Sequence, residues 1–156
     1  GRKVMNSILI DAQGVEPPPE TESLLRFAHT VLETLEKSNW EISILFTDDI
    51  LIQNLNKQYR NKDEPTDVLS FEQGTYYELP DGTTQFLAGD IAISLPAVAR
   101  NAENWNVPYA EELHRLLLHG ILHLAGYDHT TNDASEPMLI KQEALMQSLY
   151  MHQERK

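Results

Sequence analysis

Three histidines in the last part of the chain have the spacing of a metal site. His119 and His123 are four residues apart, so on a helix they lie on one face, a turn from each other. Gly126 follows, and a residue without a Cβ can take the left-handed conformation that ends a helix and reverses the chain. His129 can then return over the same face. The pattern predicts three converging imidazole nitrogens.

Three neutral imidazoles with a fourth position left open are a ligand set typical of catalytic zinc. The sequence contains no cysteine, which excludes thiolate ligands, and we expect one Zn²⁺ per chain. Such an ion lowers the pKa of a bound water towards ~7, which predicts metal-assisted hydrolysis. The other histidines have no partners at ligand spacing, and we expect them to be surface or core residues: His29, His114 and His152.

The residue after the first histidine separates two kinds of hydrolase. The histidine and glycine spacing resembles the long metzincin protease motif, HxxxHxxGxxH, in which a glutamate directly follows the first histidine and serves as general base. This chain has Gly120 at that position. A protease without the glutamate would lose a proton-transfer effect worth roughly 10²–10⁴ in rate. The sequence therefore disfavours a peptidase, which stays an alternative.

Composition limits the class of protein and its partners. A length of 156 residues suits one domain, and we expect residues 1–156 to form a single metallohydrolase domain. The formal net charge of −12 argues against general polyanion binding, and we expect no DNA partner. No apolar run approaches membrane-spanning length and no secretory signal opens the chain, so we expect a cytoplasmic protein without a membrane partner. Residues 1–4 precede Met5 and are left out of the reasoning.

Hydrophobic periodicity predicts the elements that position the histidines. Apolar and alternating segments predict strands near residues 7–11, 40–46, 67–71 and 89–94, with a hairpin excursion at 76–86. Helical spacing predicts helices beginning near residues 21, 49, 96, 108 and 137, the fourth of which carries the histidines. This order predicts an α+β fold: a mixed sheet of about four strands packed with helices, with the metal site on a long helix.

The same patterns predict inward-facing and capping residues. We expect Leu51 and Leu55 to face the core from the second helix. In the third helix the predicted inner face is Val98, Ala99 and Ala102. The expected N-caps of the third and fifth helices are Ser94 and Ser135, because a hydroxyl can accept from a free N–H of the first turn.

Basic residues gather at the end of the second helix, where Lys57, Arg60 and Lys62 supply three of the chain's 12 Lys and Arg residues. The two lysines can be explained without a function, because the helix dipole favours cations at a C-terminal end. We rate Arg60 higher, because a turn into an apolar strand at residues 67–71 follows it. The sequence does not decide whether this arginine and that strand lie beside the histidines.

Three blocks of the chain are similar to the bacterial YbeY family, the single-strand-specific endoribonucleases of ribosomal RNA maturation. They run from Leu55-Asn56 through Tyr59-Arg60 to residues 63–71, then over Gly89-Asp90-Ile91, and over residues 119–129. The resemblance implies a zinc-binding hydrolase that matures the 16S 3′ end and helps ribosome quality control. It implies the zinc ligands His119, His123 and His129, and an essential arginine, Arg60.

The chemistry of the residues suits that activity. Phosphoryl transfer concentrates negative charge on oxygens that a metal ion and a guanidinium can stabilise. We assign Arg60 to the scissile phosphate, with Lys57 and Lys62 as weaker contacts to the RNA backbone. The general base is either the metal-activated water or a carboxylate, with Asp128 the leading candidate. A second role for Asp128, orienting a metal ligand through a hydrogen bond, is at least as well supported.

The acidic net charge leads to a hypothesis about partners. An enzyme that grips RNA unaided should carry a broad basic surface, so we expect weak intrinsic affinity and targeting by ribosome-associated proteins. Two other functions stay open: a metallohydrolase of peptides or small phosphoesters, and a non-catalytic ribosome-assembly factor with a structural zinc. The open coordination position makes the last of these the weakest.

Overall fold

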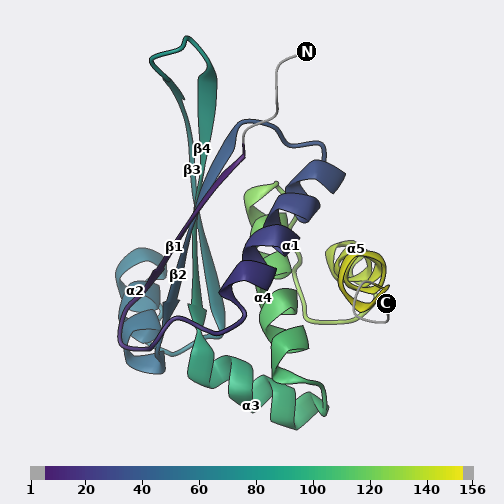
Figure 1. The fold of residues 1–156 in the computed structure, drawn as a ribbon. Helices are drawn as coiled ribbons and strands as arrows, with labels where there is room; N and C mark the ends of the chain where they lie inside the picture. Colours follow the sequence, from purple (N-terminus) through teal and green to yellow (C-terminus); the bar gives the residue numbers. More distant parts are fainter. Residues whose placement is uncertain (1–5, 153–156) are drawn as a thin grey trace.

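A four-stranded sheet with helices on both faces makes up the computed structural model, which describes residues 6–152 (Figure 1). This architecture confirms the predicted α+β fold. Residues 1–4 lie outside the described part of the chain. The single domain stays a prediction. None of the described helices is long and apolar enough to cross a bilayer. The elements in chain order are β1 (Ser7–Ala12), α1 (Thr21–Thr34), β2 (Trp40–Thr47), α2 (Asp49–Arg60), β3 (Val68–Glu78), β4 (Thr84–Ser94), α3 (Leu95–Trp105), α4 (Tyr109–Leu124), α5 (Pro137–Leu145) and a π-helical turn, η1 (Met146–Met151).

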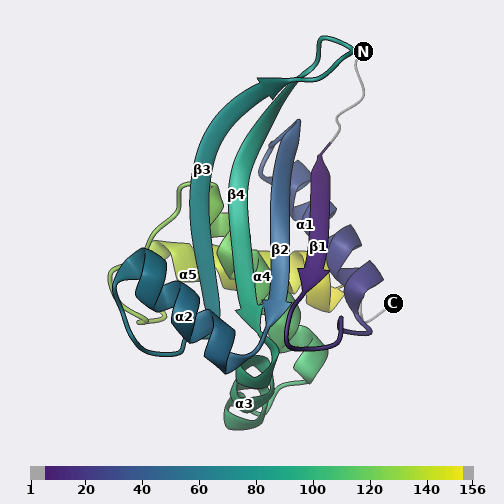
Figure 2. The same ribbon diagram turned by 90° about the vertical axis from the view of Figure 1, so that its left-hand side faces the viewer.

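The sheet has the strand order β1-β2-β4-β3. β1 and β4 both run parallel to β2, and β3 is antiparallel to β4. Helix α2 lies on one face of the sheet, and α1, α4 and α5 lie on the other (Figure 2). The predicted excursion at residues 76–86 is the far end of β3 and β4 themselves, which continue as one long hairpin to a turn at Asp81-Gly82.

Gly89 allows β3, β4 and the end of α4 to approach one another. Its φ of +150° favours glycine, and an added Cβ would lie 2.1 Å from the carbonyl oxygen of Phe71 and 2.9 Å from Leu124 Cδ2. The pairing register of the hairpin shifts here, between Glu72 and Thr75. A larger residue at this point would push apart the strand and the helix end that border the candidate site.

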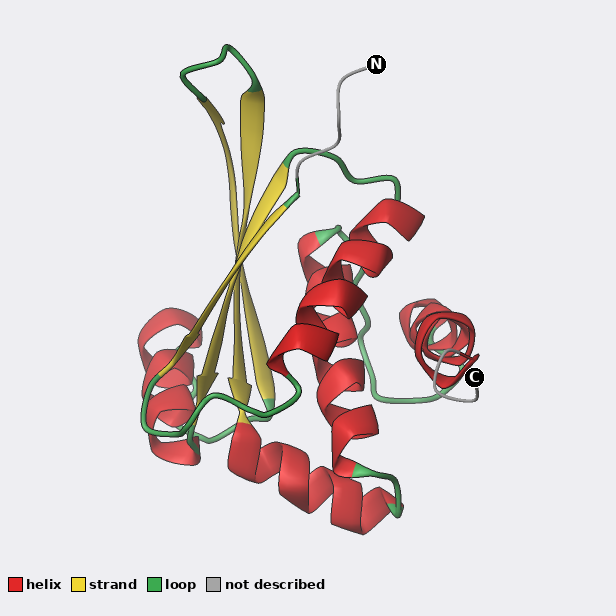
Figure 3. Ribbon diagram, viewed as in Figure 1, coloured by secondary structure: helices red, strands yellow, loops and turns green. Residues whose placement is uncertain are grey.

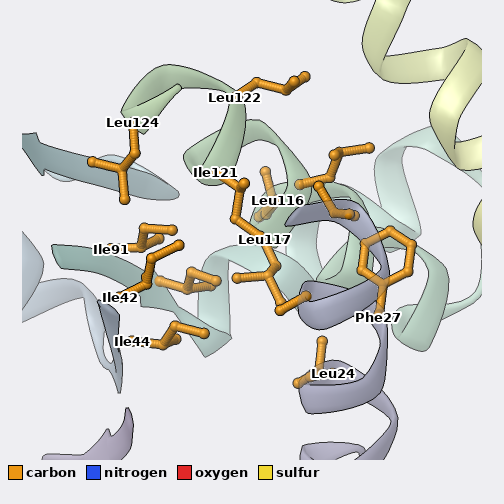
Figure 4. Packing of buried hydrophobic residues seen from close by; sticks show 14 of the residues in the cluster. Leu24, Phe27, Ile42, Ile44, Ile91, Leu116, Leu117, Ile121, Leu122 and Leu124 are labelled. Carbon is orange, nitrogen blue, oxygen red and sulfur yellow. The ribbon is translucent and has the colours of Figure 1, made fainter. Parts of the chain in front are cut away.

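Helix α4 runs through the centre of the molecule. Its apolar side chains pack between the sheet and α1, as Figure 4 shows for Leu117 and Ile121 against Ile42 and Ile91. Buried residues occur on nearly every side of the helix, because α1, α3, α5 and the sheet all surround it. Packing therefore fixes the position and rotation of the helix that carries His119.

Gly120 brings α4 close to the sheet. A Cβ added there would lie 2.7 Å from Cγ2 of Ile91, a fully buried side chain of β4. The helix can approach the strand at this point because glycine offers only hydrogen to the contact. A glutamate here, as metzincin proteases carry at this position, would require the side chain of Ile91 to move.

The predicted inner face of α2 is correct only in part, because Leu55 packs against the sheet without being fully buried. The buried residues are Ile52 and Asn56, whereas Leu51 and Leu55 are only partly buried. Ile52 packs on the sheet against Leu69 and Ala92. Asn56 is accommodated because its side-chain amide donates to the carbonyl oxygen of residue 64, 2.9 Å away. Asn56, which hydrogen-bonds to the next loop, thus occupies a buried position, whereas the apolar spacing predicted a leucine there.

Two further details differ from the predictions. In α3, Ala97 is buried and Ala99 is exposed, because the helix already begins at Leu95 and turns Ala97 toward the core. Ser94 is the N-cap, as expected, and its hydroxyl accepts from the N–H of Ala97. In α5 the N-cap position belongs to Glu136 rather than Ser135, whose hydroxyl is bonded to Asp133 instead.

Candidate metal centre

The three predicted ligand histidines lie together. One ring nitrogen from each of His119, His123 and His129 lies within 4.8 Å of the other two. The Nε2 atoms of His119 and His123 are 3.1 Å apart. In a tetrahedral site with Zn–N bonds of about 2.0–2.1 Å, two ligand nitrogens lie roughly 3.3–3.4 Å apart. The observed spacing therefore fits two ligands of one zinc-sized ion.

The end of α4 delivers the third histidine. The N–H of Gly126 donates to the carbonyl of His123 and that of Tyr127 to the carbonyl of Leu122, both at 3.0 Å. This is a Schellman ending, and Gly126 has the left-handed φ, +97°, that such an ending requires. Figure 3 shows the loop that leaves the helix here and leads to α5. His129 lies on this loop, which explains how it returns to the helix face.

Hydrogen bonds orient two of the rings for metal binding. His119 Nδ1 lies 2.7 Å from Oε1 of Gln142, and His129 Nδ1 lies 2.7 Å from the carbonyl oxygen of Thr131. These oxygens can only accept, so each Nδ1 carries the hydrogen and each Nε2 keeps its lone pair. Burial also lowers the pKa of His119 and of His123, which favours the neutral form that binds metals.

A network of charged residues holds Gln142 in place. Its Nε2 donates to Glu143, at 3.1 Å, which turns Oε1 toward His119. Glu143 accepts from Nε of Arg115 at 3.0 Å, and the same guanidinium pairs with Glu111 and Glu112 of its own helix. The orientation of His119, the first candidate ligand, is therefore set from α5 through a buried amide. Sequence reasoning missed this residue.

Gln142→Ala should weaken metal binding by about 10- to 100-fold, the usual effect of removing the group that orients a ligand histidine. Competition with a chromophoric chelator measures the dissociation constant. Gln147→Ala is the matched control, because this glutamine is exposed on the following turn, η1. A Gln142→Ala protein with wild-type metal affinity would contradict the assigned orientation.

An open cleft of about 760 Å³ adjoins the histidines. His119 and His123 line it on the helix side, and residues of α2 and β3 line the opposite side. The cleft gives a substrate access to the position that three histidine ligands would leave free. The remaining lining residues are Tyr59, Arg60, Val68, Leu69, Ser70, Phe71, Glu72, Gly126, Tyr127 and Asp128.

Arg60 lines the same cleft as the histidines, an arrangement that the sequence left undecided. It is the last residue of α2, and its guanidinium donates to the carbonyl of Ser70 and lies 5.7 Å from the ring centre of Phe71. The hydroxyl of Ser70 donates in turn to the carbonyl of Gly120, at 3.1 Å. One residue of β3 thus connects the arginine to the metal helix.

Of the other predicted site residues, Asp128 lines the cleft and the two lysines do not. Asp128 lines the cleft, with Oδ1 4.0 Å from His123 Nδ1 and 2.8 Å from the backbone nitrogen of His129, and its side chain is 86% exposed. Lys57 and Lys62 are exposed and do not line the cleft, and Lys57 pairs with Asp63 at 3.8 Å. Arg60 is therefore the only basic residue among the described residues that line the cleft.

Comparison with known proteins gives a consistent set of relatives. The family model described as endoribonuclease YbeY matches residues 12–150. Endoribonuclease YbeY of Treponema denticola is 53% identical over 133 residues, 84% of this chain and 86% of the relative. That of Borreliella afzelii is 47% identical over 122 residues, covering 77% and 80%. The solution structure of TM1509 from Thermotoga maritima superposes with a TM-score of 0.63 at 29% identity, covering 97% of this chain and 93% of that one.

Proposed function

The chain belongs to the YbeY family of endoribonucleases, and we propose that it is a zinc-dependent hydrolase that cuts single-stranded RNA during ribosomal RNA maturation. The observation that carries the proposal is that Arg60 lines the same cleft as His119 and His123, two of the three converging histidines. Phosphodiester cleavage needs positive charge fixed beside the reacting phosphate. Arg60 supplies one such charge, and a metal ion held by the histidines would supply another.

Each residue has a role in the proposed mechanism. When bound by His119, His123 and His129, a zinc ion supplies Lewis-acid stabilisation of a phosphoryl oxygen and lowers the pKa of an attacking water. Arg60 binds the other non-bridging oxygen through its guanidinium. Asp128 accepts a proton or orients His123, since it borders both the cleft and that ring. Lys57 and Lys62 contribute only weak contacts to flanking RNA.

The substrate that we propose is the 3′ region of 16S ribosomal RNA, reached in the cytoplasm with the help of ribosome-associated proteins. A net charge of −12 leaves little general attraction for RNA, and Glu72 and Asp128 border the same cleft as Arg60. Partners that dock the enzyme would supply the affinity that its own surface lacks.

Two alternatives are weaker. A peptidase of the metzincin type needs a glutamate after the first histidine, and this chain has Gly120 there, packed against Ile91. A purely structural zinc would be closed off by a fourth protein ligand. Among the described residues, no further histidine or carboxylate joins the cluster of three.

Metal content and RNA cleavage measured on the same preparation test the proposal. We expect one zinc per chain, cleavage of an unstructured RNA, loss of cleavage after removal of zinc by a chelator, and recovery when zinc is returned. A perfectly paired RNA duplex and casein serve as control substrates and should stay intact. Zinc-loaded protein that hydrolyses casein but leaves RNA uncut would refute the assignment.

A further inference from the structure

We propose that the ring of Tyr59 stacks on the nucleobase next to the scissile phosphate, and that this contact selects unpaired RNA. The inference rests on the proposed function and deepens it, because it names how the same site reads its substrate. It starts from a second groove that meets the metal cleft.

The second groove lies on the face of the sheet that α2 only partly covers. Its volume is about 680 Å³, and it is lined by residues of α2 and of all four strands. Tyr59 and Phe71 line both this groove and the metal cleft. The two hollows therefore adjoin at an aromatic pair, and an RNA chain bound at the histidines would have these rings beside it.

Tyr59 offers an open aromatic surface at this junction. Its side chain is 62% exposed although it is a large ring next to a cleft. The ring meets Phe71 edge to face, with the centres 5.4 Å apart, and Phe71 is anchored against the buried cluster of Ile52, Leu69 and Ala92. The tyrosine thus has a firm support on one side and solvent on the other, as a stacking platform requires.

The position of Tyr59 in the chain relates it to the reacting phosphate. Arg60 is the next residue, and its guanidinium packs near the same Phe71 ring. If Arg60 holds the scissile phosphate, an adjoining base lies within reach of the tyrosine ring. Stacking on aromatic side chains is a general way in which proteins bind unpaired bases.

The chemistry of the second groove favours a base over a phosphate. None of the described residues that line it is basic, and its polar members include Asp11 and Asp90. Carboxylates repel phosphates but can accept hydrogen bonds from the edges of bases. Gln73 donates to Asp90 at 2.6 Å, so that carboxylate is held in place. We therefore place a base at the junction and leave the sugar-phosphate backbone outside the groove.

Selection of single strands follows from this geometry. In a duplex both faces of each base are covered by its neighbours, so no face is free for Tyr59. An unpaired nucleotide can turn its base onto the ring at little cost. The contact is worth about 1–3 kcal/mol for each stacked base, which corresponds to roughly a 5- to 150-fold effect.

The test uses the zinc-loaded protein and an unstructured oligoribonucleotide whose cleaved bond is mapped first. Tyr59→Ala should lower kcat/KM by about 5- to 150-fold, while Tyr59→Phe and Tyr59→Trp keep most of the activity. RNA with an abasic ribose beside the cleaved bond should slow the wild type to a similar extent. On that RNA Tyr59→Ala should cause no further loss. Trp105→Ala is the control, because this ring is 73% exposed at the end of α3 and lines neither hollow.

Two results would overturn the inference. One is a Tyr59→Ala protein that cuts the complete RNA as fast as the wild type. The other is an equal loss on complete and on abasic RNA at every position tested. Wild-type protein that cuts no RNA would instead refute the proposed function. Stacking would then be decided by fluorescence anisotropy, because Tyr59→Ala should weaken binding of an intact labelled oligonucleotide and not of an abasic one.

Discussion

Replacing His123 with alanine should abolish zinc binding and RNA cleavage and leave the fold intact. The imidazole is one of three candidate ligands that the described residues bring together, and a metal ion that stabilises a transition state by several kcal/mol accounts for at least about 10³ in rate. The side chain is only half-buried, and the leucines of α4 provide the packing. Metal analysis, cleavage of unstructured RNA and circular dichroism measure the three quantities.

His152→Ala is the matched control for this experiment, because His152 is exposed at the end of the described chain, outside the cluster. It should bind one zinc and cut RNA at the wild-type rate. If His123→Ala unfolded, or if chelation unfolded the wild type, the metal would be structural. Full cleavage by a zinc-free His123→Ala protein would contradict the metal-dependent mechanism outright.

Local patterns were sufficient to predict most of the secondary structure. Alternating apolar residues from Trp40 to Phe46 identified β2, and the glycine after the histidine helix identified its end. Both signals are carried by neighbouring residues, so the rest of the fold is not needed to interpret them. The long hairpin was predicted only in part, because the outer half of β3 is exposed and lacks an alternating apolar pattern.

Burial within a helix was harder to predict than the helix itself. In α2 the fully buried positions are Ile52 and Asn56, one residue along from the expected leucines, and Leu55 packs there only partly buried. Apolar spacing gives the width of an inner face but not its rotation when polar residues contribute to it. Asn56 is buried because a loop backbone supplies its partner, and that partner depends on the path of the chain after the helix.

In the candidate site, too, the residues that are close in sequence were predicted and those that depend on distant parts of the chain were not. The two helical histidines and His129 are close in sequence, so helix geometry and one glycine were enough to bring them together. Arg60 reaches the cleft through β3, whose place at the sheet edge next to β4 follows from long-range pairing. Gln142 left a weak signal: a polar residue at core spacing between Met138 and Leu145. Such a residue indicates a buried partner without identifying it.

Arg60→Ala should reduce kcat by about 10²–10³ while zinc content and thermal stability stay at wild-type values. The reduction follows from the cleft, where Arg60 is the only basic residue among the described lining residues, so no neighbour can replace its charge. The fold should be unaffected because Arg60 is exposed and its contacts are one backbone carbonyl and the ring of Phe71. Single-turnover cleavage with saturating enzyme separates the chemical step from RNA binding.

Arg60→Lys and Lys57→Ala sharpen this prediction. Lysine keeps the charge but loses the planar fork, so it should recover part of the rate, and less than the full wild-type value. Lys57 is exposed and paired with Asp63 outside the cleft, so its removal should raise KM slightly and leave kcat unchanged. If Arg60→Ala raised KM alone, the guanidinium would bind RNA without acting on the transition state. If Lys57→Ala lowered kcat as much as Arg60→Ala, the reacting phosphate would lie near the exposed surface of α2. That position would contradict a phosphate held between Arg60 and the histidines.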